Sequence, residues 1–359
     1  MKSNRNVIIW SKEVFDLIDG RPIGGIAVQM FFWSKIFTEH GWNVYSLSEC
    51  SHKTTARDNI IFKPIRSIRG INLLLEWCWS LVYLLSIRPN VVIFRGANRQ
   101  LLPLALLSRP LNIKLVYFSA SDVNFEPGKE LVGSEINRKL YHYSLKHIRY
   151  FITQNTHQSE TLRVNFGNNS LMLPNIWAEN IAIDCSNVIH GDVVWIANFR
   201  RLKRAEWVLN LAKRMPEIKF VMAGGRLGSD SYYDEIEEKS RLISNVSFLG
   251  PQSFLQANSL VANSKVLLCT STFEGFPNTF LQAWSNGIPV VSTVDPSGVI
   301  AKFNLGIVAR TEEEILLALL RLMNDNEYYE QISRSVLDYF NTHHSAKLGY
   351  NKLIQYINE

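Results

Sequence analysis

Short apolar runs alternate with helix-periodic segments along nearly all of the 359 residues, and this alternation restricts the fold more than any other feature. Many runs are continuous stretches of Val, Ile, Leu and Phe, which is typical of parallel strands covered on both faces. Between them lie amphipathic stretches such as 205–215, where Trp207, Val208 and Leu211 share a helix face. We therefore expect an α/β fold with doubly wound sheets. The expected strands are 6–10, 42–47, 91–94, 113–118, 150–153, 192–197, 218–223, 246–249, 266–270 and 289–292.

The alternation stops once, in the segment PNIWAENIAIDCSNVIH at 174–190, and then restarts. A stretch without periodicity between two periodic regions indicates a linker. We predict two Rossmann-like domains, at 1–176 and 177–343. An amphipathic C-terminal helix within 344–359 could pack on either domain, including back on the first.

The composition, 47% hydrophobic and 19% charged, is that of a folded globular protein. The cysteines Cys50, Cys78, Cys185 and Cys269 are scattered, without a CxxC pair or clustered histidines. This spacing argues against a zinc site and a disulfide scaffold and fits the cytoplasm. Cys78 and Cys269 lie in apolar runs and are expected in the core.

The formal net charge of +6 predicts an anionic partner: a nucleotide phosphate, an acidic membrane surface or nucleic acid. Nucleic acid is the weakest of the three because the chain carries no recognised nucleic-acid-binding signature. The apolar run at the N-terminus is too short for a secretory signal.

Residues 71–87, INLLLEWCWSLVYLLSI, form the most apolar segment, but it is short for a membrane span and Glu76 interrupts it. A buried helix is the favoured interpretation. The alternative is a helix lying in a membrane interface. In that case, the aromatic residues Trp77, Trp79 and Tyr83 would lie at headgroup level, flanked by Arg66, Arg69 and Arg88.

The segment 271–293, STFEGFPNTFLQAWSNGIPVVST, follows an expected strand and turns through Gly275 and Pro277 into a helix that begins near Asn278 or Thr279. Loops that enter helices at the carboxyl edge of a parallel sheet bind anions, because free N–H groups and the helix dipole face the ligand. Glu274 beside that loop can accept hydrogen bonds from hydroxyl groups. This combination suits a sugar attached to phosphate.

The EGFPN loop, its helix and the GIPVVST strand resemble the donor-binding signature of the retaining family 4 glycosyltransferases (glycosyl transferases group 1). The resemblance extends from WIANFRRLKR through FVMAGG and VSFLG to DPSG and is fainter in the first domain. It implies a GT-B fold, with two Rossmann-like domains facing each other across a cleft. It also implies that Glu274 contacts the donor sugar and that the loop residues Gly275, Phe276, Pro277, Asn278 and Thr279 bind the donor.

The family usually has a second acidic residue, for the nucleotide ribose, eight positions after the first, and 282 − 274 = 8. Gln282 occupies that position here. A glutamine can still hold a ribose hydroxyl, with a loss of about 1–2 kcal/mol compared with a charged acceptor. The departure puts ribose affinity and nucleotide preference in question.

Four cations lie within five positions after the first strand of the second domain: Arg200, Arg201, Lys203 and Arg204. Breaking the bond between sugar and phosphate places negative charge on the departing diphosphate, which fixed cations stabilise. By the resemblance, the diphosphate-binding pair is Arg200 and Lys203, and Arg201 is the alternative. We expect no metal and no cofactor, because no Asp-x-Asp or other carboxylate-rich motif accompanies this loop.

Three further candidates lie in the first domain. The paired glycines Gly24 and Gly25 would let the backbone approach the donor phosphate, although an ordinary turn explains them equally well. Asp122 is a candidate acceptor-binding or base residue, against a turn or capping role. His157 lies in ITQNTHQSETL, a segment like the family's Gln-containing stretch, and is expected to be a surface residue.

The resemblance implies a retaining glycosyltransferase that uses a UDP- or GDP-linked sugar. Its acceptor would be a saccharide or a lipid-linked saccharide in bacterial surface polysaccharide synthesis (O-antigen, capsule or exopolysaccharide). The expected location is the cytoplasm, peripheral at the cytoplasmic face of the inner membrane. Two alternatives stay open: a GT-B nucleotide-sugar epimerase and an inactive GT-B scaffold subunit. No GxGxxG follows the first strand, which argues against a dehydrogenase.

Overall fold

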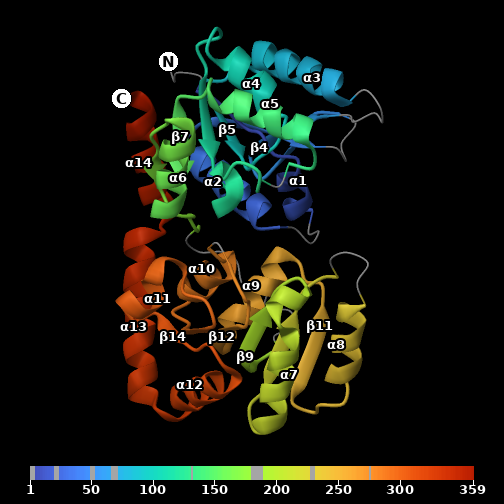
Figure 1. Ribbon diagram of the computed structural model, residues 1–359, viewed down its shortest axis with the longest axis vertical. Coiled ribbons are helices and arrows are strands. Elements are labelled where there is room, and N and C mark those ends of the chain that lie inside the picture. Colours follow the sequence, from blue (N-terminus) through green and yellow to red (C-terminus); the bar gives the residue numbers. More distant parts are fainter. Residues whose placement is uncertain are drawn as a thin grey trace. The chain divides into compact units, whose positions relative to one another are not determined.

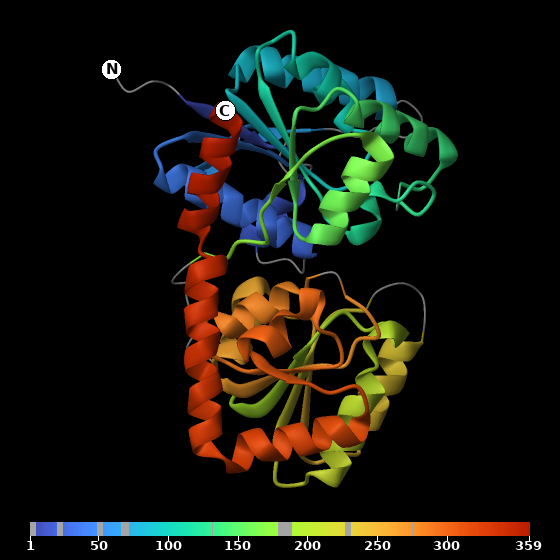
Figure 2. The ribbon, with the colours of Figure 1, turned by 60° about the vertical axis from the view of Figure 1, so that its left-hand side comes forward.

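The computed structural model describes residues 5–19, 24–48, 53–65, 72–130, 132–178, 189–226, 231–274 and 276–359. Within them the chain forms two compact units (Figures 1 and 2). The first contains the described residues up to Ile176 together with Ala346–Glu359, and the second is Trp177–Ser345.

The sheet of the first unit has the strand order β3-β4-β2-β1-β5-β6-β7-β8, and all neighbours are parallel except β3 and β4. Its strands are β1 (Asn6–Ile9), β2 (Asn43–Ser48), β3 (Thr55–Arg57), β4 (Ile60–Pro64), β5 (Val91–Arg95), β6 (Lys114–Phe118), β7 (Tyr150–Thr153) and β8 (Leu171–Met172). Its helices are α1 (Glu13–Ile18), α2 (Gly25–Glu39), α3 (Asn72–Ile87), α4 (Leu101–Ser108), the 3-10 helix η1 (Asp122–Phe125), α5 (Glu135–Leu145), α6 (Thr156–Phe166) and α14 (Ala346–Asn358).

The apolar runs form the strands because both faces of this sheet are covered. Helices α3, α4 and α5 lie over one face of the sheet (Figure 1). Their described side chains belong to a continuous core that includes Tyr83, Leu104 and Tyr141. Helix α2 packs against β1 and β2. Strands β5 and β7 are almost fully buried, which explains why they read as unbroken apolar runs in the sequence.

The second unit is a parallel sheet in the order β11-β10-β9-β12-β13-β14. Helices α7 and α8 pack together, as do α9 and α10. Its strands are β9 (Gly191–Ile196), β10 (Phe220–Ala223), β11 (Val246–Gly250), β12 (Ser264–Cys269), β13 (Val290–Ser292) and β14 (Gly306–Val308). Its helices are η2 (Arg201–Lys203), α7 (Ala205–Arg214), α8 (Tyr232–Ser240), α9 (Phe254–Ala262), α10 (Asn278–Trp284), η3 (Pro296–Gly298), α11 (Val299–Phe303), α12 (Glu312–Asn324) and α13 (Asn326–His343).

The backbone comes unusually close to itself where β10 ends. Gly224 has a φ of +156°, and a Cβ atom added there would lie 1.8 Å from the carbonyl oxygen of Ala197. Only glycine fits this position, because a side chain would overlap the loop that follows β9. The FVMAGG segment therefore holds that loop close to the sheet.

The α/β prediction with doubly wound sheets is confirmed, and each of the ten expected strands has a counterpart. Four observed strands, β3, β4, β8 and β14, were not predicted. Strand β3 is exposed throughout and β8 has only two residues, so neither carries an apolar run. The boundary between the units lies at Ile176–Trp177, and residues 179–188 of the expected linker lie outside the described residues.

The C-terminal helix α14 belongs to the first unit and packs on α2. The indole Nε1 of Trp42 donates to the hydroxyl of Tyr350 at 2.8 Å, and the ring of Tyr350 stacks on His40. A Cβ atom on Gly349 would lie 2.4 Å from Ile176, so glycine permits the close contact of the helix with this segment.

Helix α3 is not buried on all sides, contrary to the favoured interpretation. Leu81, Val82 and Leu85 expose 43%, 49% and 50% of their surface, and Cys78 on the same face is also exposed. The prediction that Cys78 lies in the core is wrong, because the apolar run covers both the buried and the exposed face of one helix. Cys269 is buried, as predicted. Among the described residues, no helix has the length and apolarity needed to cross a bilayer.

Candidate functional site

The sequence-predicted cations and Glu274 lie at one point of the second sheet. The chain leaves β9 toward β10 on one side, and β12 pairs on the other side of β9. Loops at the carboxyl ends of two such strands diverge and leave a crevice in which α/β proteins bind ligands. Residues 197–204 follow β9 and residues 270–274 follow β12, so both predicted motifs lie at this edge of the sheet.

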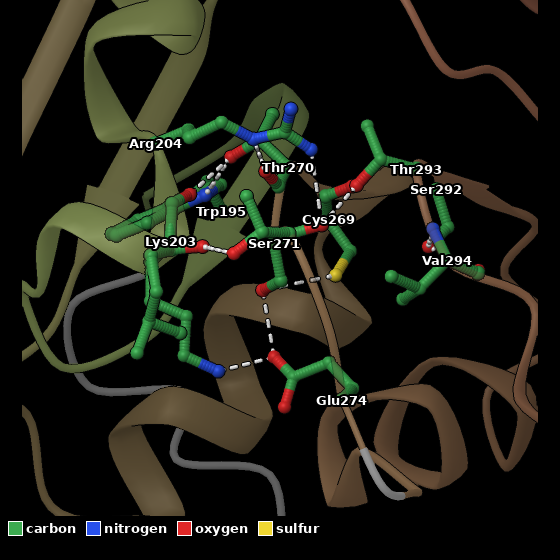
Figure 3. A network of polar contacts seen from close by, with 12 residues as sticks. Trp195, Lys203, Arg204, Cys269, Thr270, Ser271, Glu274, Ser292, Thr293 and Val294 are labelled. Carbon is green, nitrogen blue, oxygen red and sulfur yellow. Dashed lines mark hydrogen bonds and ion pairs between the residues drawn. The ribbon is translucent and has the colours of Figure 1, made fainter.

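The loop after β9 is fixed to the loop after β12 by backbone and hydroxyl groups. The amide of Thr272 donates to the carbonyl of Leu202 at 2.8 Å, and the hydroxyl of Thr270 donates to the carbonyl of Lys203 at 2.6 Å. The indole of Trp195 in β9 donates to the same Thr270 hydroxyl at 3.0 Å. These contacts hold η2 in one position relative to β12 (Figure 3).

The side chains of Lys203 and Glu274 contact each other at this edge of the sheet (Figure 3). The Nζ of Lys203 forms a charged hydrogen bond with Oε1 of Glu274, and both side chains are 18% exposed. The hydroxyl of Ser271 donates to the same carboxylate oxygen at 2.7 Å. One ammonium group and one carboxylate are thereby held side by side, partly open to solvent.

Arg204 has a structural position, pointing into the protein rather than outward (Figure 3). Its Nε donates to the carbonyl of Thr270 at 2.6 Å and its Nη2 to the carbonyl of Ser271 at 3.0 Å. Burial lowers the pKa of this guanidinium below its ordinary value. The side chain also covers the ring of Trp207 at 3.9 Å, so Arg204 is committed to holding the end of β12.

Arg201 and Arg200 differ in their surroundings. Arg201 lies 3.5 Å from the carboxylate of Glu235 and over the ring of Tyr232. Arg200 is exposed, and within the described part of the chain its side chain has no hydrogen-bond or ion-pair partner. Of the two arginines, Arg200 is therefore the one open to a ligand.

The EGFPN loop enters α10 with Pro277 at the N-cap and Asn278 as the first helical residue. Phe276 turns toward the protein and packs against Trp284 and His344. Thr279 is half-buried in the first turn. Gly275 lies outside the described residues. Phe276 thus anchors the loop, while Pro277, Asn278 and Thr279 line the start of the helix.

Gln282 is buried, with 4% of its surface exposed, one helical turn after Asn278. Its backbone carbonyl accepts from Ser285 and from the side chain of Asn286. Its side-chain amide has no hydrogen-bond partner among the described residues.

The first-unit candidates Gly24, Gly25 and Asp122 are not brought together by contacts that the structure describes. Gly24 is the N-cap of α2 and Gly25 its first residue, and neither has a positive φ. Asp122 opens η1, and its Oδ1 accepts from Asn155 at 2.9 Å and Gln158 at 2.8 Å. Two amide donors on one oxygen give Asp122 a role in fixing this loop.

His157 is 58% exposed and lies 3.1 Å from Glu126, as expected of a surface residue. Among the described residues, no group of three or more His, Cys, Asp or Glu side chains could hold a metal ion.

Sequence reasoning missed the inward position of Arg204 and the hydroxyl of Ser271. No signal in the sequence distinguishes Arg204 from its basic neighbours, because its position depends on a left-handed backbone with φ of +48°.

Comparison with known proteins relates the second unit to one family. Residues 190–325 match the glycosyl transferases group 1 family. An uncharacterized glycosyltransferase of Methanocaldococcus jannaschii is 25% identical over 232 residues, covering 57% of this chain and 56% of that protein. Glycosyltransferase 1 domain-containing protein 1 of Xenopus tropicalis is 28% identical over 163 residues, covering 43% and 46%. The chain thus spans about half the length of these relatives.

The fold is also that of solved structures. Sucrose-phosphate synthase from Thermosynechococcus elongatus superposes with a TM-score of 0.76 at 11% identity, over 99% of this chain and 98% of that one. At this identity the similarity concerns the fold alone.

Proposed function

We propose that the chain is a retaining glycosyltransferase, because residues 190–325 of its second unit match the glycosyl transferases group 1 family and the chain has the GT-B fold. The observation that carries the proposal is the placement of Arg200, Lys203 and Glu274 at the point between β9 and β12 where the loops diverge. Two cations and one hydroxyl-binding carboxylate are the groups that a nucleotide sugar requires there.

In the proposed reaction, Arg200 and Lys203 bind the diphosphate of the donor. An acceptor hydroxyl oxygen forms a bond to the anomeric carbon of the donor sugar while the bond from that carbon to the diphosphate oxygen breaks. The hydroxyl proton passes to the departing phosphate, and the electron pair of the broken bond stays on it. The two cations stabilise the charge that develops on the leaving group, so they act mainly in the transition state.

The remaining donor contacts are proposed from the second unit and, for Gly24 and Gly25, from the first. Glu274 accepts hydrogen bonds from sugar hydroxyls once Lys203 turns toward phosphate. Gln282, at the position where the family usually has its second acidic residue, meets a ribose hydroxyl through its side-chain amide. Gly275, Phe276, Pro277, Asn278 and Thr279 form the loop around the donor, which is a UDP- or GDP-linked sugar. The reaction needs no metal ion, since fixed cations replace it.

For the acceptor we propose a saccharide or lipid-linked saccharide of bacterial surface polysaccharide synthesis, modified at the cytoplasmic face of the inner membrane. The support is the net charge of +6 and the stripe of exposed apolar side chains on α3, formed by Cys78, Leu81, Val82 and Leu85. These positions share one helix face, as in helices that lie in a membrane interface. Replacing Leu81 and Leu85 by Ser should reduce sedimentation with anionic lipid vesicles. The same change at exposed Leu317 in α12 serves as the control.

A donor-hydrolysis screen with UDP-, GDP- and ADP-sugars tests the activity, with EDTA present. We expect slow release of one nucleoside diphosphate, lowered at least tenfold in Arg200→Ala. The control is Arg214→Ala, an exposed arginine of α7 whose Nη2 lies 2.7 Å from Glu313. An epimerised sugar in place of hydrolysis or transfer would indicate an epimerase. Absence of binding to all three classes of nucleotide would indicate a scaffold.

A further inference from the structure

The first unit has a cavity of about 370 Å³ at the carboxyl ends of β1, β5 and β6. Strands β2 and β5 lie on opposite sides of β1, so the loops after β1 and β5 diverge here as they do in the second unit. This is the position at which open α/β sheets hold ligands. The cavity is lined by residues 10–13, 94–98 and 120–121, with further side chains from Ile26, Met30, Gln100 and Asn124.

Arg95, the last residue of β5, places a guanidinium in the wall of this cavity. Its Nη2 donates to Oδ1 of Asn175 at 2.7 Å, while its Nε is buried and has no hydrogen-bond partner. Among the described residues, no carboxylate lies within salt-bridge distance of it. Burial lowers the pKa of Arg95 to about 10, so the group stays charged at neutral pH.

Burial of the charged Arg95 guanidinium costs free energy, which a partner group must offset. Buried charges in proteins are ordinarily paired, and a guanidinium offers five N–H donors in a planar fork. Arg95 uses one of them on a neutral amide. The geometry that completes the fork is a phosphate or carboxylate bound through two parallel hydrogen bonds.

The other polar groups of the cavity suit a hydroxylated molecule. Asn98, Gln100 and Ser121 lie in the same wall, and Lys12 adds a second cation. Glu13 lies at the same cavity, and burial, followed by the charge of Asp16, raises the pKa of its carboxyl group.

We propose that this cavity binds the acceptor and that the acceptor carries a phosphate or carboxylate group, which Arg95 receives through Nε and its neighbouring N–H groups. The identification of the ligand as the acceptor rests on the proposed function. The prediction that the ligand is an anion rests on the cavity alone.

The binding test uses the full chain carrying Arg200→Ala and Lys203→Ala, so that phosphate cannot bind at the second-unit cations. Glucose 6-phosphate, glucuronate and methyl glucoside are titrated calorimetrically up to about 10 mM. We expect glucose 6-phosphate or glucuronate to bind at one site per chain, and the stronger of the two identifies the anionic group. Methyl glucoside should bind at least tenfold more weakly.

Arg95→Gln should lower the affinity for the anionic sugar at least tenfold. Arg163→Gln, which removes the same charge from the exposed face of α6, should change this affinity less than twofold. Circular dichroism and urea unfolding establish that the variants fold. Should Arg95→Gln not fold, Arg95→Lys keeps the charge without the fork and is expected to lose at least threefold. Equal affinity in the folded Arg95 variant, or no binding of either anionic sugar, overturns the proposal.

A transfer assay separates this inference from the proposed function. In the otherwise unaltered chain, Arg95→Gln should raise the KM for the acceptor at least tenfold and leave the KM for the donor within twofold. Anionic-sugar binding without any transfer would refute the glycosyltransferase and leave the cavity assignment standing. Transfer that is unaffected by Arg95→Gln would refute the cavity assignment alone.

Discussion

Replacing Lys203 by Gln removes one charge from the pair that lies at the centre of the proposed donor site. In the ligand-free chain its ammonium group contacts Glu274, and Ser271 donates to the same oxygen. Each charged side chain is 18% exposed, so the pair is neither fully buried nor freely solvated. The substitution therefore affects both folding and binding.

The stability effect should be moderate. A hydrogen bond to a charged group contributes about 1.5–3 kcal/mol, and partial solvation reduces the loss to about 1–2 kcal/mol in the free energy of unfolding. The effect on the binding free energy should be of similar size. Loss of one diphosphate contact should weaken the nucleoside diphosphate at least tenfold, or about 1.4 kcal/mol, and lower turnover at least tenfold. Lys203→Ala and Arg200→Ala should each lower turnover by the same factor.

Glu274→Gln should have the opposite effect on the affinity for the nucleotide. Removing the carboxylate releases Lys203 and takes away a negative charge beside the phosphate, so diphosphate affinity should hold or rise. Transfer should still fall, because the glutamine is a weaker acceptor for sugar hydroxyls. This difference of sign separates a catalytic arrangement from a pair that only holds two loops together.

The assay is calorimetric titration with UDP or GDP, whichever the hydrolysis screen selects, and with the corresponding nucleoside, in EDTA. The matched control is Lys265→Gln, whose ammonium group lies 3.6 Å from Asp192 at the opposite end of β12. Lys203→Gln should weaken the diphosphate but not the nucleoside, and Lys265→Gln should change neither. Equal diphosphate affinity for Lys203→Gln and the unaltered chain would refute the assignment.

Other consequences can be checked by unfolding and labelling. Arg204→Gln removes two hydrogen bonds to carbonyl groups and should lower the free energy of unfolding by about 2–3 kcal/mol in urea. Gly224→Ala should cost about 3 kcal/mol or more because its Cβ meets a carbonyl oxygen. At Gly298, with φ of +70° and open space, the same change should cost about 1 kcal/mol. With the two other cysteines replaced by Ser, Cys78 should react with a thiol reagent in the folded chain. Cys269, whose thiol pKa is raised by burial, should react only on unfolding.

The sequence was sufficient for the architecture because both sheets are covered on their two faces. Runs such as 91–95 and 150–153 are apolar at nearly every position, and this pattern identifies a parallel sheet without further information. The short edge strands escaped because β3 and β8 have no buried face to mark them. Cys78 was misplaced for a related reason, since α3 is apolar on its exposed face as well.

The site could be predicted in part. The family resemblance placed Lys203 and Glu274 in one donor site, and the structure brings their side chains into contact. The sequence could not assign the roles of the neighbouring arginines. The direction of their side chains depends on backbone conformation and on carbonyl groups, which a sequence does not display. Arg95 was missed for the same reason: it ends an apolar strand as a single charge, and only the fold shows that its Nε is buried without a partner.

The central claim is that one diphosphate lies against Arg200 and Lys203 between the ends of β9 and β12, and a crystal structure of the chain with UDP or GDP in EDTA tests it most directly. The account predicts phosphate oxygens within hydrogen-bond distance of the Lys203 ammonium and the Arg200 guanidinium, with no metal ion. Electron density for the nucleotide at any other place in the second unit, with both cations directed away from it, would contradict it.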